Sequence, residues 1–155
     1  MNRTGKRRLL KLAAMLMADA KNKKGIQFDI GTVGRSTGEP FKVKQVVPLD
    51  CGTSACAMGL AALSGEFKKA GLSYKIQNDF LSQNQIWTRW NGRTVDYDKA
   101  AMKLFGVTKE QADYLFSPWT YPLNKRTGAV GEYEVIRRIK CIVAGKKVEQ
   151  VSTAW

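Results

Sequence analysis

Two cysteines five positions apart are the residues of this chain most suited to covalent chemistry. Cys51 and Cys56 lie in the run 49–60, at the expected start of a helix of small residues. A cysteine near a helix N-terminus has a lowered thiol pKa, because unpaired backbone N–H groups favour the thiolate. Cys51 is therefore the best nucleophile candidate. It would still need a base, and the carboxylate of neighbouring Asp50 would oppose formation of the thiolate.

The rest of the composition argues against an enzyme. The chain contains no histidine, which excludes Ser-His-Asp and Cys-His catalysis and histidine metal ligation within one chain. The spacing of Cys51 and Cys56 is loose for a zinc site, and Cys141 could add only a third sulfur. We therefore expect the cysteines to be small core residues, with no catalytic residue, metal or cofactor. A cysteine-dependent enzyme is the remote alternative.

The charge distribution points to an anionic partner. The chain has 26 Lys and Arg against 13 Asp and Glu, a net charge of +13, and residues 1–44 alone carry +8 of it. A clustered positive field attracts polyanions, of which nucleic acid is the commonest. Solubility or an acidic protein partner would also explain basic residues. The unevenness exceeds what solubility needs, so nucleic acid is preferred.

The basic residues near the N-terminus fall on two expected segments. Residues 5–20 predict an amphipathic helix, with leucines and alanines on one side and a basic stripe at i, i+4 and i+8 on the other. Residues 21–48 predict a long basic loop, rich in glycine. The candidate phosphate contacts are Arg3, Arg7, Lys11, Lys23, Lys24, Lys42 and Lys44. The helix lacks the aromatic anchors of a membrane-surface helix, so no membrane partner is expected.

Residues 86–97 predict a β-hairpin, because Asn91-Gly92 between two β-prone runs is a strong signal for a two-residue turn. The expected cross-strand pairs are Trp90–Arg93, Arg89–Thr94 and Trp87–Asp96. This register places Trp87 and Arg89 on the face away from the helices. An exposed tryptophan beside an arginine stacks on nucleic-acid bases. Trp87 covering a second minor core is an equally good interpretation.

Local signals place the remaining elements. Thr53 is expected to cap a helix over 54–63 that forms the buried centre of the fold. Gly106 should end a helix over 97–105, and Thr108 with Gln111 forms a capping-box signature for the next helix. A last helix begins at Glu132.

The pattern as a whole predicts an α+β fold: a single compact, mostly helical domain over 1–155 with a small antiparallel β-hairpin. Its parts are the basic amphipathic helix 5–20, the long basic loop 21–48, and the helical core 49–145 with the hairpin 86–97. No apolar run reaches the length of a membrane-spanning helix. No signal-peptide cleavage site is recognised, so a cytoplasmic location is expected.

Three segments together carry a resemblance to known proteins. They are Phe28-Asp29-Ile30, the Cys-Gly-Thr-x-x-Cys-x-x-Gly pattern over 51–59, and Phe105-Gly106-Val107-Thr108 followed by Leu115-Phe116. In these three segments the chain resembles a diffuse group of small, uncharacterised bacteriophage and bacterial proteins. The resemblance implies a phage or prophage origin and action in the cytoplasm of a host cell. It supplies no residue roles.

The expected function is that of a non-enzymatic basic binding protein, phage-encoded, that engages nucleic acid or a nucleic-acid-associated host complex. Trp87 and Arg89 would add base stacking to the phosphate contacts. The alternative is an anti-defence protein that inhibits a host defence or regulatory factor by covering an acidic surface, or a virion component.

Overall fold

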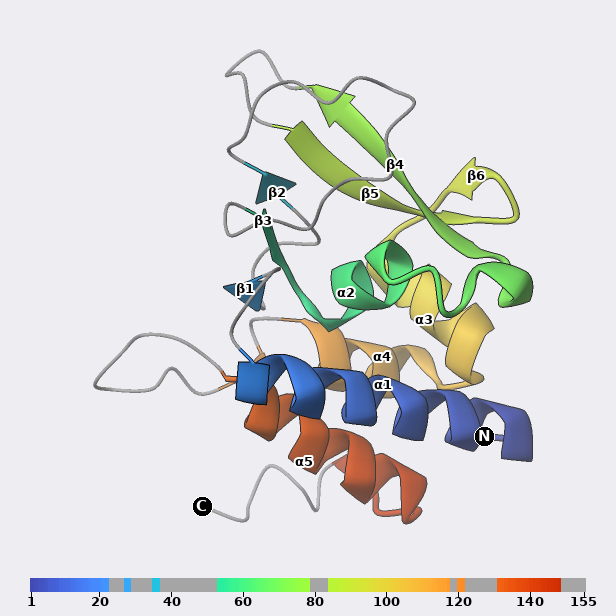
Figure 1. The fold of residues 1–155 in the computed structure, drawn as a ribbon. Helices are drawn as coiled ribbons and strands as arrows, with labels where there is room; N and C mark the ends of the chain where they lie inside the picture. The colour runs from blue at the N-terminus through green and yellow to red at the C-terminus, as the bar shows by residue number, and fades with distance from the viewer. Residues whose placement is uncertain are drawn as a thin grey trace.

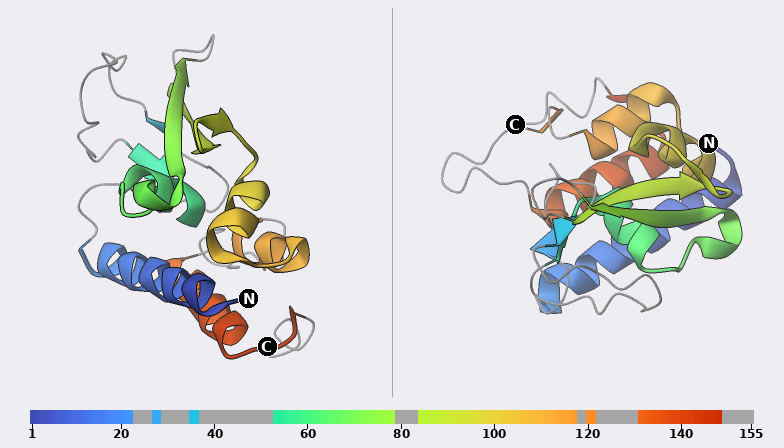
Figure 2. Two further views of the ribbon diagram at one scale, coloured as in Figure 1. Left: turned by 90° about the vertical axis from the view of Figure 1, so that its right-hand side faces the viewer. Right: turned by 90° about the horizontal axis from the view of Figure 1, so that it is seen from above.

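The computed structural model describes residues 1–22, 27–28, 35–36, 53–78, 84–117, 120–121 and 131–148. Its elements lie in layers, with a sheet on one side, α2 and α3 against it, and α1, α4 and α5 beyond them (Figure 1). The left view in Figure 2 shows the same order of layers. The fold is α+β and mostly helical, as the sequence predicts. One core cluster takes in residues from Leu9 to Ile142.

The helices match the sequence pattern closely, apart from α2. They are α1 (Arg3–Asn22), α2 (Ala57–Leu63), α3 (Tyr97–Phe105), α4 (Lys109–Phe116) and α5 (Glu132–Val143), with the 3-10 turn η1 (Lys68–Ala70). Gly106 ends α3 in the left-handed conformation, with φ of 63°. Thr108 and Gln111 form both hydrogen bonds of the expected capping box at the start of α4. These ends were predictable because each depends on only a few neighbouring residues.

The predicted hairpin is one corner of a larger sheet. Strand β5 (Asn84–Trp90) pairs antiparallel with β4 (Leu72–Asn78) over seven residue pairs and with the short β6 (Arg93–Thr94) on its other edge. Three further short strands extend the sheet beyond β5. They are β1 (Gln27–Phe28), β2 (Arg35–Ser36) and β3 (Thr53–Ala55). Two of them, β1 and β2, lie within the segment 21–48 that was predicted as a loop.

The turn of the hairpin agrees with its sequence signal. Asn91 and Gly92 both have positive φ, 47° and 82°, as a two-residue turn matched to the twist of the strands requires. The pairs Arg89–Thr94 and Trp90–Arg93 form as predicted. The predicted pair Trp87–Asp96 is wrong, because β6 ends at Thr94. The chain then turns into α3, and Asp96 is the residue that precedes that helix.

The predicted start of α2 is also wrong. Thr53 does not cap a helix; Thr53–Ala55 forms β3, which pairs with β1 and β2. The helix begins at Ala57 after Cys56. Pairing with strands distant in sequence overrides the local capping signal. Six of the seven residues of α2 are buried, so its expected place at the centre of the fold is confirmed.

The first helix is fixed against α3 at a very close approach. A Cβ added to Gly5 would lie 1.9 Å from the carbonyl oxygen of Phe105. Arg8 Nη1 donates to the carbonyl oxygen of Leu104 at 2.9 Å. Leu9, with Leu12 and Leu16 further along, is fully buried. These contacts set the rotation of α1 about its axis, and so decide which of its side chains face solvent.

A buried arginine joins the C-terminal end of α4 to α5. Arg138 is 2% exposed, and its guanidinium carbon lies 4.1 Å from the ring centroid of Tyr114 and 3.6 Å from that of Tyr121. It donates to the carbonyl oxygens of Tyr114 and Thr120, both at 2.6 Å. Burial raises the pKa of Tyr121 far above its usual value. Tyr121 is thus a core residue and not part of a binding surface.

Candidate nucleic-acid interface

Part of the predicted basic stripe lines a groove between α1 and η1. Arg3, Arg7 and Lys11 are exposed on α1. Arg7 and Lys11 share a cavity of about 430 Å³ with Lys69 of η1 and with Phe67. We call the three cations Arg7, Lys11 and Lys69 the α1–η1 groove. Lys69 is 58 positions after Lys11 in the sequence, so packing of η1 beside α1 creates this cluster.

One carboxylate moderates the charge of the groove. Glu66 forms an ion pair with Lys11, and both side chains are about half exposed (50% and 49%). The ammonium group of Lys11 also lies 5.9 Å from the centroid of the Phe67 ring. Arg8 lines the groove too, but its guanidinium is engaged by the carbonyl of Leu104. An exposed ion pair contributes little stability, so a phosphate can replace Glu66 at Lys11 at small cost.

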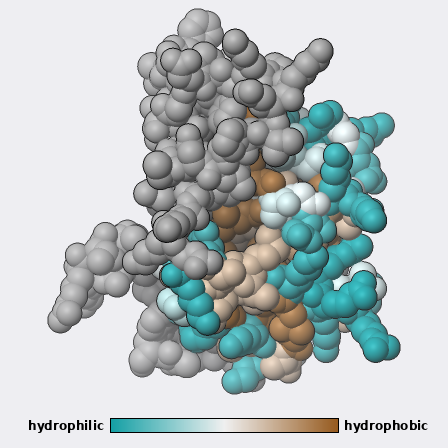
Figure 3. Space-filling view, viewed as in Figure 1, coloured by the Kyte–Doolittle hydropathy of each residue, from teal (hydrophilic) through white to brown (hydrophobic). Residues whose placement is uncertain are grey.

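The tip of the hairpin lies beside the end of η1. The N–H group of Asn91 donates to the carbonyl oxygen of Gly71 at 2.9 Å, which places the turn directly beside the end of η1. Arg93 follows the turn and is exposed. Figure 3 shows hydrophilic side chains gathered on the right-hand side of the molecule, where the hairpin, η1 and the start of α1 lie.

The other predicted site residues lie on the outer face of the sheet. Trp87 is 41% exposed, whereas its neighbours Ile86 and Thr88 are 2% exposed and face the helices. Of the two interpretations left open for Trp87, the structure thus agrees with the exposed one. Arg89 lies on the same face and donates to the carbonyl oxygen of Gly92 in the turn, so its guanidinium is partly engaged.

Register adds a cation to this face that sequence reasoning missed. Lys75 of β4 pairs directly with Trp87 and is exposed. Paired residues of neighbouring strands point to the same side of a sheet, so the ammonium group and the indole share one surface. The alternation of side chains along β4 could have indicated that Lys75 is exposed. That Lys75 lies opposite Trp87, however, depends on the register of β4 and β5.

The structure divides the predicted site residues between two surfaces. Arg3, Arg7 and Lys11 lie on α1, in the layer farthest from the sheet, and Trp87 and Arg89 lie on the sheet (Figure 1). The layer of α2 and α3 separates them, so they do not form one flat patch. The remaining predicted contacts, Lys23, Lys24, Lys42 and Lys44, lie outside the described residues.

The cysteines give no support for thiol chemistry in the described residues. Cys56 is buried and Cys141 half-buried, and neither forms a disulfide. Cys51 lies outside the described residues. No group of three histidine, cysteine, aspartate or glutamate side chains in the described part of the chain is arranged to hold a metal ion. None of the helices described is long and apolar enough to cross a membrane.

Comparisons of the chain with protein-family models, curated proteins and solved structures give no match. The geometry of these two surfaces therefore carries the proposal below.

Proposed function

We propose that this chain is a non-enzymatic nucleic-acid-binding protein that holds phosphate groups in the α1–η1 groove. The observation that carries the proposal is the position of Lys69 beside Arg7 and Lys11, in a hollow lined by elements distant in sequence. Lysine and arginine side chains around a concave surface attract successive phosphates of a strand and release their counterions. Arg3 extends the row by one helical turn of α1.

Spacing along α1 suits a polyanion better than a single anion. Arg3, Arg7 and Lys11 are four residues apart, which corresponds to about 6 Å between successive side chains along the helix axis. A single phosphate would be held by one or two of these cations. A strand would meet all of them in turn, together with Lys69 across the groove.

Binding of labelled DNA and RNA, single-stranded and duplex, at two salt concentrations tests the proposal. We expect binding at low salt that weakens steeply as salt rises, because counterions compete for the same cations. Absence of binding to every probe at 50 mM salt would refute it.

The alternative partner is an acidic protein surface, which the same cations would fit. Affinity purification with and without nuclease separates the two. Loss of the co-purified material after nuclease supports the nucleic-acid proposal, and a stoichiometric complex that survives nuclease supports the alternative. The phage origin and cytoplasmic location implied by the resemblance stay predictions.

A further inference from the structure

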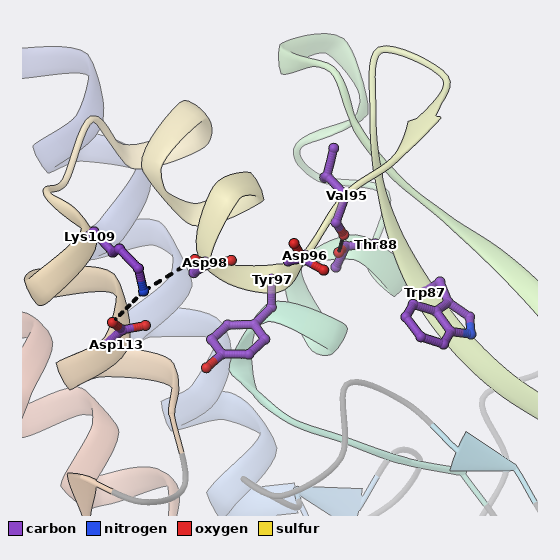
Figure 4. Close-up of a pocket in the computed structure, with 8 residues that line it drawn as sticks. All are labelled: Trp87, Thr88, Val95, Asp96, Tyr97, Asp98, Lys109 and Asp113. Carbon is purple, nitrogen blue, oxygen red and sulfur yellow. Dashed lines mark hydrogen bonds and ion pairs between the residues drawn. The ribbon is translucent and has the colours of Figure 1, made fainter.

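A second cavity, of about 340 Å³, lies between β5 and the N-terminal ends of α3 and α4. Its walls include Trp87, Asp96, Tyr97, Asp98, Lys109 and Asp113. Figure 4 shows the rings of Trp87 and Tyr97 on either side of Asp96, with Lys109, Asp98 and Asp113 beyond Tyr97. Ligand cavities commonly combine such apolar walls with a few polar groups that fix orientation.

The aromatic rings are the first feature that points to a ligand. Trp87 leaves 41% of its surface exposed and lines the cavity, so a planar ligand that covered it there would bury apolar surface favourably. Its indole is part of the cavity wall together with the half-buried phenol of Tyr97. Planar bases stack on such rings because every base has a π face.

The carboxylates are the second feature. Three aspartates line this cavity although the chain as a whole carries +13. Asp96 pairs with Lys99 at 2.8 Å, and Lys109 pairs with Asp113 at 2.8 Å and with Asp98 at 3.7 Å. Two ammonium groups thus face three carboxylates, and oxygens remain that only accept hydrogen bonds. The cavity therefore suits a neutral ligand with N–H donors better than a phosphate.

A cation for the phosphates, Lys75, lies on the other side of β5, on β4. Lys75 pairs with Trp87 of β5. The cavity lies on the opposite side of β5, next to β6 and α3. A strand passing Trp87 would thus keep its phosphates near Lys75 and direct a base toward the carboxylates. The hairpin turn beside η1 connects this surface with the α1–η1 groove.

We propose that this cavity binds an unstacked nucleobase that carries an exocyclic amino group, such as cytosine or adenine. The amino group donates to a carboxylate, as aspartate and glutamate accept from cytosine N4 in known recognition. Thymine and uracil present a carbonyl oxygen at the same edge, and a carboxylate has no proton to offer it. The inference rests on the proposed function, because the base belongs to a strand held by the groove, and it specifies single-stranded nucleic acid.

Two DNA oligonucleotides of 12 residues, all cytosine and all thymine, test this at pH 7.5 by fluorescence anisotropy. Their phosphates are equal in number, so a difference reports on the bases. We expect the cytosine strand to bind about threefold to tenfold more tightly, the effect of one net hydrogen bond. Asp96→Asn should abolish the difference, because an amide also donates to the thymine carbonyl. The substitution should fold, since the Asp96 side chain makes no cap hydrogen bond and asparagine is an equally good residue at that position.

Trp87→Ala should weaken both strands by about fivefold or more, the effect of one lost stacking contact. Tyr133→Ala, which removes a 58% exposed ring from α5, is the matched control and should change neither. Equal affinity for the two strands, or no effect of Trp87→Ala, would overturn the base-binding inference. If binding still weakened as salt rose, the groove proposal would stand. Failure of both strands to bind at 50 mM salt would overturn the base-binding inference, and the groove proposal would fall with it only if duplex DNA and RNA also failed to bind.

Discussion

The salt dependence of binding should fall by a calculable amount when two cations of the groove are neutralised. The change is the double substitution Arg7→Gln with Lys69→Gln, one on each wall. Both side chains are exposed, so the free energy of unfolding should change little, by about 0.5 kcal/mol or less. Each phosphate contact with a single strand contributes about 0.7 to the slope of log K against log salt. The slope should therefore become shallower by about 1.4.

The size of the effect follows from the number of cations along the groove. With Arg3, Arg7, Lys11 and Lys69 engaged, the four contacts predict a slope of about −2.8 and a loss of affinity of about 50-fold between 50 and 200 mM salt. The double variant should lose only about sevenfold over that range. The difference between the slopes does not depend on contacts elsewhere in the chain, because they are common to both proteins.

A charge-matched variant separates a local contact from the general positive field. Lys146→Gln with Lys147→Gln removes two exposed cations after α5 and lowers the net charge by the same amount. Fluorescence anisotropy over five salt concentrations should give this variant nearly the slope of the original protein. Equal changes of slope in the two double variants would refute the groove and indicate binding by net charge alone.

The substitution Glu66→Gln should change the affinity in the opposite direction, toward tighter binding. Glu66 pairs with Lys11 in the free protein and would repel an incoming phosphate. Its neutralisation should tighten binding at 50 mM salt by about 1.4-fold to fivefold, because an exposed ion pair of about 0.2–1 kcal/mol no longer competes. Unchanged or weaker binding would place the phosphates away from Lys11.

Three further changes test the packing that positions the site. Arg138→Met should lower the free energy of unfolding by about 3 kcal/mol or more in urea titration, because buried carbonyl oxygens lose a charged donor; a loss under 1 kcal/mol would contradict this. Gly5→Ala should cost about 1–3 kcal/mol, since its Cβ meets the Phe105 carbonyl oxygen, and an unchanged melting temperature would rule that contact out. Burial and then the charge of Glu132 raise the pKa of Asp19, so its ionised form is disfavoured on folding and stability rises as pH falls through that pKa. Asp19→Asn should raise the melting temperature at pH 7 and not at pH 3, and a decrease at pH 7 would contradict the sign.

Elements set by neighbouring residues could be predicted, and those set by distant pairing could not. Asn91-Gly92 fixes its own turn, and Gly106 ends α3 where expected, because each signal acts within a few residues. Thr53 carries an equally good capping signal, yet it lies in β3. The strands that pair with β3 come from the segment 21–48, where glycines gave no strand pattern.

The candidate site shows the same division. Exposure of Arg7 and Lys11 followed from helical periodicity alone, since the leucines of α1 define its buried side. The contribution of Lys69 did not, because it depends on where η1 packs. The acidic lining beside Trp87 was also hidden, since Asp98 and Asp113 are brought to β5 only by the packing of α3 and α4.

In the proposed function, the groove supplies affinity and the cavity beside Trp87 supplies selectivity, and the fold keeps the two surfaces apart. Two of the three cations of the groove, Arg7 and Lys11, project from α1. Gly5 and the buried leucines fix the rotation of this helix, so the backbone positions both charges. Carboxylates there would weaken phosphate binding, and among the described residues that line the groove Glu66 is the one acidic side chain. Acidic side chains gather instead at the cavity beside Trp87, behind an aromatic wall, where a base and not a phosphate would meet them. The same carboxylates also stabilise the N-terminal turn of α3 or pair with Lys99 and Lys109, so the affinity of Asp96→Asn for the two strands, and not their position alone, decides whether they also meet a base.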